Sequence, residues 1–258
     1  MSKPVLIFTP GAWHSPEVFG IVISKLTALG YRCIALPLLA VGQKPAVRDL
    51  QPDIAAVREA VLRESDAGND VMMVAHSWSG IVVADALEGL SKAEREKNGG
   101  KGGVVKLAFM CAFVPSEHVS LIDAFGGQIP EFYDIKEPWV TVKSPETVFY
   151  HDLGPEQQAY WTSRLQPHSY ATKFVGATMA AWRTIPSAYL ICEDDRAIPV
   201  AVQEAMVKNC QDAGAPMETE RIFTSHSPFL SKPDDVVGFL RRAVGEKECQ
   251  GPRIERDI

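Results

Sequence analysis

Short apolar runs of strand length alternate with amphipathic segments through the first 115 residues of the chain. The runs occupy residues 4–9, 32–36, 71–75 and 105–113, and a segment with apolar residues at helical spacing follows each of the first three. A strand that is apolar at every position is typical of a sheet buried on both faces. This alternation therefore predicts an α/β fold, with a mainly parallel sheet and helices on both of its faces.

The alternation stops at residue 116 and resumes at residue 187. The intervening residues 116–186 hold 11 of the 22 aromatic residues, which could form a small core of their own, line an apolar pocket, or do both. We expect a core built from residues 1–115 and 187–246, an aromatic-rich lid inserted at 116–186, and a flexible tail at 247–258. Residues 91–103 are charged and then Gly-rich, which predicts a solvated surface loop.

Composition narrows the class of protein further. The net charge is −6 and no basic stripe is present, so we expect no nucleic-acid partner. No apolar run has the length of a membrane span, and no signal-peptide pattern begins the chain. The five cysteines are widely spaced without a Cys-x-x-Cys pair, which argues against a disulfide framework or a structural metal site and favours a cytoplasmic location.

The strongest chemical signal is a serine placed between a strand and a helix. Residues 74–80 read Val-Ala-His-Ser-Trp-Ser-Gly, with the small residues Ala75 and Ser79 two positions either side of Ser77. A nucleophile elbow needs small residues at these positions, because the backbones approach closely around a strained turn. The usual pattern has glycine at both, so an ordinary tight turn is the alternative; the strand and helix on either side favour the elbow.

A serine hydroxyl needs a base within hydrogen-bond reach, and the base needs a group that orients it. His226 follows the last expected strand, at the carboxyl edge of the sheet where Ser77 also lies. His76 points elsewhere from the turn and suits a packing role, while His14 could contact substrate or support a residue that does. The remaining histidines are expected at the surface of the lid: His118, His151 and His168.

The orienting carboxylate should lie between Ser77 and His226 in the chain. Three adjacent acids, at residues 193–195, follow the strand at 188–192. Asp195 is favoured and Asp194 is second; a charged, solvated turn is the less favoured alternative. Glu117 is an outside candidate, because some hydrolases place the acid after the preceding strand.

An oxyanion hole needs two backbone N–H groups directed at the developing charge. One should come from Trp78, directly after the serine, and the other from Ala12 in the loop after the first strand. Gly11 would let that backbone approach closely. We expect substrate contacts from this loop and from the lid: Gly11, Trp13, His14, Trp139 and Trp161.

With these residues identified, the chain resembles the α/β-hydrolase superfamily. Within it, the chain is similar to the small lidded esterases of the methylesterase and hydroxynitrile lyase group and their microbial relatives. The similar segments are residues 10–14, 75–80, 112–115, 189–199 and 225–226, within a match over about residues 3–244. The resemblance implies that Asp195 is the catalytic aspartate, a choice that the residues alone leave open.

The resemblance implies a cofactor-independent serine hydrolase, with Ser77, His226 and Asp195 as catalytic triad. It would act through an acyl-enzyme on a carboxylic ester or lactone of a small apolar molecule, possibly aromatic or polyketide-like in character. Hydroxynitrile lyases have a threonine where Gly11 stands and a lysine where Ser227 stands, so cyanohydrin cleavage is not expected. Two alternatives remain: carbon–carbon cleavage, elimination or cyclisation of a secondary metabolite, and a small-molecule receptor with a vestigial triad. A homodimer is left open.

Overall fold

The computed structural model describes residues 3–246, so the expected flexible tail at 247–258 lies outside the described residues. Six parallel strands form the central sheet in the order β2-β1-β3-β4-β8-β9. The strands are β1 (Val5–Thr9), β2 (Cys33–Ala35), β3 (Val71–His76), β4 (Val104–Met110), β8 (Ser187–Cys192) and β9 (Met217–Ile222). The predicted α/β fold with a mainly parallel sheet is confirmed.

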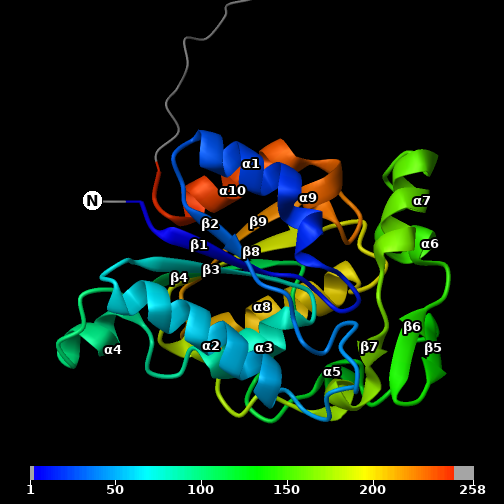
Figure 1. Cartoon of the computed structure of the whole chain (residues 1–258), viewed down its shortest axis with the longest axis horizontal. Coiled ribbons are helices and arrows are strands. Elements are labelled where there is room, and N and C mark those ends of the chain that lie inside the picture. The colour runs from blue at the N-terminus through cyan, green and yellow to red at the C-terminus, as the bar shows by residue number, and fades with distance from the viewer. Residues whose placement is uncertain (1–2, 247–258) are drawn as a thin grey trace, which may run out of the picture.

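Helices cover both faces of this sheet (Figure 1). One face carries α1 (Gly20–Ala28), α9 (Pro228–Ser231) and α10 (Pro233–Ala243), and the other carries α2 (Gln51–Asp66), α3 (Ser79–Ala86) and α8 (Val200–Asp212). Every residue of β1 and of β3 is buried, as expected for strands covered on both sides. Full burial of a side chain such as Phe8 or Ile7 stabilises the fold by roughly 1.5–3 kcal/mol, so these central strands hold the core together.

Residues 116–186, the segment predicted to form a lid, form a layer whose buried side chains belong to the same hydrophobic core as the parallel sheet. An antiparallel sheet of β5 (Tyr133–Lys136), β6 (Trp139–Val142) and β7 (His168–Ser169) lies there. The helices of this layer are α5 (Leu121–Ala124), α6 (Pro145–Phe149) and α7 (Pro155–Arg164), with 3₁₀ helices η2 (Tyr170–Phe174) and η3 (Ala181–Arg183). Figure 1 shows β5–β7, α6 and α7 beside the edge towards which the parallel strands run. This is the edge where ligands bind in such sheets.

One predicted loop contains a helix. Within residues 91–103, the chain forms α4 (Lys92–Lys97), so the loop prediction is wrong there. The Ser91 side chain accepts a hydrogen bond from the Glu94 backbone N–H (3.2 Å) and caps the helix. No residue of α4 is buried, which explains why the sequence shows no apolar periodicity.

A further 3₁₀ helix, η1 (Pro16–Phe19), leads into α1.

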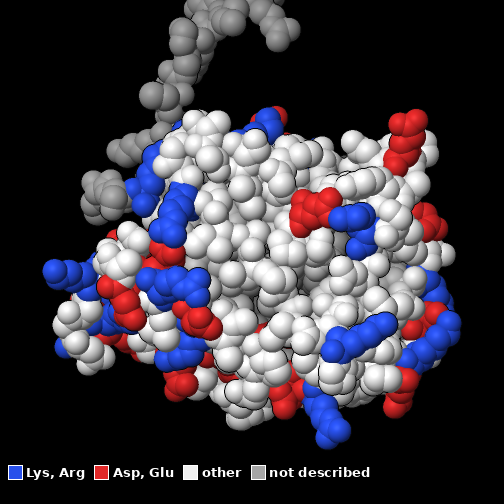
Figure 2. All heavy atoms as spheres, in the orientation of Figure 1, with Lys and Arg blue, Asp and Glu red and all other residues white. Residues whose placement is uncertain are grey.

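Charged side chains of both signs lie mainly toward the rim of the face drawn in Figure 2, and much of its centre is uncharged. Within residues 3–246, no helix has both the length and the apolar character that crossing a bilayer requires.

Candidate active site

Ser77 occupies a strained turn between β3 and α3. Its φ of +56° lies in the left-handed region, which a residue with a Cβ adopts at a cost of about 1–3 kcal/mol. The Ser77 carbonyl oxygen accepts hydrogen bonds from the backbone N–H groups of Phe113 (3.0 Å) and Gly80 (3.2 Å), which help to hold the turn. A Cβ at Gly80 would lie 1.9 Å from the Phe113 carbonyl oxygen, so this position requires glycine.

Ser79 replaces the second glycine of the usual elbow pattern, and its hydroxyl has a structural use. The buried Oγ accepts from the His76 backbone N–H (3.1 Å) and lies 3.0 Å from the Thr9 hydroxyl. It thereby links the end of β3 to the end of β1. Gly11, in the loop after β1, passes so close that a Cβ there would lie 2.7 Å from the Ser77 Cβ.

The structure brings Ser77, His226 and Asp195 into one hydrogen-bonded chain. The His226 Nε2 lies 2.8 Å from the Ser77 Oγ, and its Nδ1 lies 2.7 Å from the Asp195 Oδ2. His226 stands in the loop between β9 and α9, and Asp195 stands in the loop after β8. All three side chains are buried, with Ser77 the most exposed at 8%. A proton on Nδ1 leaves the Nε2 lone pair free to accept the serine proton.

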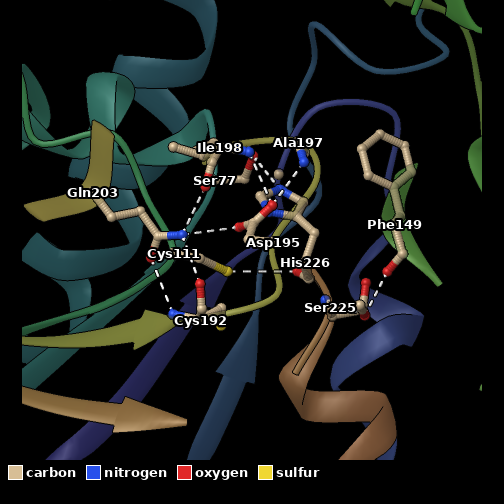
Figure 3. Close-up of polar contacts among 12 residues, drawn as sticks. Ser77, Cys111, Phe149, Cys192, Asp195, Ala197, Ile198, Gln203, Ser225 and His226 are labelled. Carbon is tan, nitrogen blue, oxygen red and sulfur yellow. Dashed lines mark hydrogen bonds and ion pairs between the residues drawn. The ribbon is translucent and has the colours of Figure 1, made fainter. Parts of the chain in front are cut away.

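Asp195 is fixed by donors on both of its oxygens (Figure 3). Its Oδ1 accepts from the backbone N–H groups of Ala197 (2.7 Å) and Ile198 (2.9 Å). Its Oδ2 accepts from the Gln203 amide (3.2 Å) in addition to facing His226. These bonds leave the carboxylate a single orientation, with Oδ2 toward the imidazole ring.

The other two acids that the sequence offered lie elsewhere. The Asp194 side chain pairs with His151 instead of His226: its Oδ2 lies 3.0 Å from the His151 Nε2. Glu117 forms a partly exposed ion pair with Arg183, at 2.7 Å. Of the three candidates, only Asp195 contacts His226.

The backbone of Ala12 and Trp78 borders the serine. Both residues line the cavity at Ser77. Among the described residues, neither backbone N–H has a hydrogen-bond acceptor within the protein. Two free N–H groups beside a nucleophile can receive a negatively charged oxygen.

His76 and His14 are buried and support the site rather than face the cavity. His76 Nδ1 accepts from the Gly11 backbone N–H (3.2 Å), which leaves its Nε2–H to donate to the His226 carbonyl oxygen (2.9 Å). His14 lies between the Ala12 carbonyl oxygen and the Tyr150 hydroxyl, each at 2.7 Å. Burial lowers the pKa of His76 well below its usual value and lowers the pKa of His14 to about 4. Both rings are therefore neutral near pH 7.

The three lid histidines differ from one another. His118 is exposed, as expected, whereas His151 is partly buried against Asp194. The prediction of a surface position is wrong for His168, which is fully buried with its ring centroid 4.4 Å from that of Trp78. Its short strand, β7, pairs with β6.

The cavity at Ser77 is small and apolar, with a volume of about 20 Å³. Besides the serine and His226, it is lined by Ala12, Trp13, Trp78, Phe113, Leu121, Phe125, Phe132, Tyr133, Phe149, Ala197 and Ile198. Trp13 is thus the one expected contact that lies in the wall. Four lid aromatics line it, but the two chosen from the sequence do not.

Trp139 and Trp161 were expected to contact substrate, and the structure places both outside this cavity. Trp139 pairs with Lys136 in the β5–β6 hairpin, and Trp161 packs against Tyr160 at 5.0 Å between ring centroids. Gly11 and His14 also lie behind the wall rather than in it. The sequence signal for the four aromatic residues that do line the cavity is the aromatic excess of residues 116–186. That excess does not indicate which of its side chains face the cavity.

Larger cavities lie elsewhere. One of about 400 Å³ is lined by residues that include Lys3, Tyr31, Asp70, Lys106 and Glu246, at the opposite end of the strands. It contains no paired nucleophile and base. The small cavity at Ser77 is therefore the candidate active site.

One group among the described residues has the composition of a metal site. The ligand atoms of His76, Cys111 and His226 lie within 4.8 Å of one another. The ring nitrogens of both histidines already have hydrogen-bond partners, and the Cys111 thiol lies 3.5 Å from the His226 carbonyl oxygen. Binding of a metal here would require a His226 ring nitrogen that now contacts Ser77 or Asp195.

Comparison with known proteins places this geometry in context. A family model described as "Alpha/beta hydrolase family" matches residues 6–239. The Alpha/beta hydrolase nvfD of Aspergillus novofumigatus is 36% identical over 251 residues, covering 95% of this chain and 98% of that protein. Methyl jasmonate esterase 1 of Vitis vinifera is 22% identical, covering 92% and 95%. The solved structure of polyneuridine aldehyde esterase superposes with a TM-score of 0.76 at 16% identity, covering 93% and 99%.

Proposed function

The chain belongs to the α/β-hydrolase family, and from this premise we propose that it is a serine hydrolase that cleaves a carboxylic ester or lactone of a small, largely apolar molecule. The single observation that carries the proposal is the hydrogen-bonded chain from Ser77 through His226 to Asp195, which ends in an apolar cavity. Membership of the family by itself supports only the general class of hydrolase. Because one fold hosts many reactions, the choice of an ester or lactone substrate must be argued from the site.

In the proposed reaction, His226 Nε2 takes the proton of the Ser77 hydroxyl while the serine oxygen attacks the substrate carbonyl carbon. The backbone N–H groups of Ala12 and Trp78 donate to the resulting oxyanion. His226, now protonated and oriented by Asp195, gives its proton to the leaving alkoxide oxygen. Water, deprotonated by the same histidine, then releases the acid and restores the serine.

The lining of the cavity supports an uncharged substrate. Apart from His226, its wall contains no histidine, lysine, arginine, aspartate or glutamate side chain. A carboxylate or ammonium group of a substrate would be buried there without a partner, which costs several kcal/mol. The volume of about 20 Å³ has room for about one water molecule, so substrate access requires displacement of part of the lid.

Relatives with related names support the ester part of the proposal. Methyl jasmonate esterase 1 and Methylesterase 1 of Arabidopsis thaliana are named for ester hydrolysis, and this chain covers 95% of each. Their identities of 22% and 24% do not extend to a particular substrate.

The test is active-site labelling followed by turnover. A fluorophosphonate probe should modify the wild-type protein, and mass spectrometry of the digested adduct should place the label on Ser77. The Ser77→Ala variant should remain unlabelled at an unchanged melting temperature. A panel of aryl and alkyl esters should then show multiple turnovers with the wild type and none with the variant. Labelling at another serine, or turnover that survives Ser77→Ala, would refute the proposal.

A second candidate uses the same residues for a reaction without net hydrolysis, such as carbon–carbon cleavage, elimination or cyclisation. The observation in its favour is the closed, aromatic cavity, because exclusion of water protects reactive intermediates. Product analysis in H₂¹⁸O separates the two candidates. Hydrolysis of an ester or lactone places one ¹⁸O atom in the acid and frees a hydroxyl group. Carbon–carbon cleavage frees no hydroxyl group, and cyclisation or elimination places no ¹⁸O in the product.

A further inference from the structure

Lys173 is a fully buried lysine in the 3₁₀ helix η2 of the lid. Lysine is among the residues that proteins bury least, and a buried lysine is normally paired with an acid. Across residues 3–246, no carboxylate oxygen lies within the 4.0 Å of a salt bridge to its Nζ. The side chain therefore needs a different explanation.

Aromatic rings take the place of a carboxylate. The Lys173 Nζ lies 4.8 Å from the ring centroid of Trp13 and 5.0 Å from that of Trp78. Both distances are within the range of a cation–π interaction, which is strongest with tryptophan and in the absence of water. The Nζ also lies 3.0 Å from the Nδ1 of His168. We call Lys173, Trp13, Trp78 and His168 the lysine cage.

Hydrogen bonds define the role of the histidine in this cage. The Thr172 hydroxyl donates to the Ser169 carbonyl oxygen (2.7 Å), so its oxygen can accept from the His168 Nε2–H at 3.3 Å. A proton on Nε2 leaves the Nδ1 lone pair to accept from Lys173. Burial, followed by the charge of Lys173, lowers the pKa of His168 well below its usual value, which keeps the ring a neutral acceptor.

One further titratable group faces the cage. Burial lowers the pKa of Lys173 well below its usual value, and the charge of Asp53, on α2, opposes this lowering. Asp53 accepts hydrogen bonds from the backbone N–H groups of Leu39 and Ala40. The Ala40 carbonyl oxygen in turn accepts from the Ser169 N–H (2.8 Å), so the lid segment that carries Lys173 is fastened to the core beside an acid.

The two tryptophans of the cage adjoin the proposed reaction centre. Trp13 directly follows Ala12, Trp78 directly follows Ser77, and both line the cavity. The Trp13 indole N–H donates to the Val140 carbonyl oxygen (2.8 Å). Among the described residues, the indole N–H of Trp78 has no acceptor. The polar contact that orients the Trp78 ring is therefore with Lys173, and His168 packs against it edge-on at 88°.

We propose that Lys173 is a positioning residue for the reaction: inserted from the lid between two indole rings and hydrogen-bonded to His168, its Nζ group fixes Trp13 and Trp78, and through them the backbone N–H groups of Ala12 and Trp78. The inference rests on the proposed function. It explains why a lysine is buried at this place, and it links a lid residue to the oxyanion hole without contact with substrate.

The test replaces Lys173 with methionine, which has a similar unbranched side chain and no charge. With a short acetate ester as substrate, kcat should fall at least about tenfold, equal to about 1.4 kcal/mol of transition-state stabilisation, while KM changes less than about threefold. Ser169→Ala is the matched control. It lies four residues away and loses the bond from the Val47 N–H (3.1 Å), yet its hydroxyl does not contact the indoles. This control should lower the melting temperature and leave kcat unchanged.

A second readout does not depend on catalysis. Removal of the polar Nζ group from two indole faces should change the intensity and position of tryptophan emission in Lys173→Met, whereas Ser169→Ala should leave the spectrum unchanged. If Lys173→Met does not fold, His168→Phe replaces it, because the ring against Trp78 is kept and the acceptor for Lys173 is lost. The same loss of kcat at constant KM is then expected.

Three outcomes would overturn the inference. They are an unchanged kcat in the folded variant, a kcat loss that Ser169→Ala matches at an equal loss of melting temperature, and an emission spectrum that Lys173→Met leaves unchanged. Absence of Ser77-dependent ester hydrolysis in the wild type would instead refute the proposed function, and the emission experiment would still decide whether the cage exists.

Discussion

Replacement of Asp195 by asparagine should cost far more activity than the same replacement of its neighbour Asp194. The asparagine oxygen must stay toward the N–H groups of Ala197 and Ile198, because its NH₂ group cannot accept from them. The NH₂ group then faces the His226 Nδ1, where the carboxylate accepted a hydrogen bond. Two donors would meet across 2.7 Å, so the imidazole proton moves to Nε2.

That change of tautomer disables the base. With a proton on Nε2, His226 can no longer accept the proton of the Ser77 hydroxyl, which lies 2.8 Å away. Loss of the correct tautomer in a Ser-His-Asp triad lowers kcat by about 10⁴-fold, which is about 5.5 kcal/mol. Asp194 contacts only the partly exposed side of the site, through His151 at 3.0 Å. Such a pair contributes at most about 1 kcal/mol to stability, so Asp194→Asn should keep kcat within about twofold.

The assay is steady-state hydrolysis of a p-nitrophenyl ester, with melting temperatures measured on the same preparations. Glu117→Gln is a further control, because Glu117 pairs with Arg183 at the surface. Equal losses of kcat in Asp195→Asn and Asp194→Asn, at equal melting temperatures, would refute the reasoning. So would an Asp195→Asn variant that retains more than about a tenth of wild-type kcat.

Three further predictions concern the base, the lid and acid stability. Ser77→Ala and His226→Ala should each lower kcat by roughly 10³–10⁶-fold, and the double variant should be little worse, because the residues act as a unit; additive losses measured by the same assay would contradict this. Phe132→Ala should raise KM for bulky esters at least roughly tenfold and leave KM for a short acetate ester unchanged, because it removes roughly 1.5–3 kcal/mol of apolar contact. Trp139 lies outside the cavity, so Trp139→Ala should leave the ratio of the two KM values unchanged. Burial holds the pKa of His14 at about 4, below its value of 6.5 in the unfolded chain, so its contribution of up to about 3 kcal/mol is present above pH 6.5 and lost as the pH falls toward 4. Urea unfolding at several pH values should show a shallower loss for His14→Gln, and parallel curves would refute it.

The sequence predicts the central sheet and the elbow well because both have local signals. Runs such as β1 and β3 are apolar up to their last residues, Thr9 and His76. Close contacts require glycine at Gly11 and Gly80 beside Ser77. The position of the acid cannot be predicted from local signals alone. Which carboxylate of residues 193–195 faces His226 depends on the turn after β8, and Gln203 of α8, together with two backbone N–H groups, fixes that turn. A linear pattern does not contain this information.

The lid gives weaker signals because its strands are short and its side chains alternate between two faces. Aromatic excess predicts a pocket wall, but Phe132 lies in that wall and Trp139 does not. His168 looked like a surface residue, since its neighbours in the chain are polar. Its burial results from pairing with β6 and from contacts with Trp78 and Lys173. Trp78 is distant in sequence, and Lys173 lies in a segment whose sequence has no regular apolar pattern.

Four consecutive residues of the lid contact the three loops that carry His226, Asp195 and Ala12. Phe149 and Asp152 accept hydrogen bonds from Ser225, the residue before His226. Tyr150 bonds to His14 in the loop that carries Ala12, and His151 bonds to Asp194, the residue before Asp195. Residues 149–152 therefore hold the loops of His226, Asp195 and Ala12 at the same time. Displacement of these residues would disturb all three loops, whereas displacement of α5 or of the β5–β6 hairpin could widen the cavity and leave these four contacts in place.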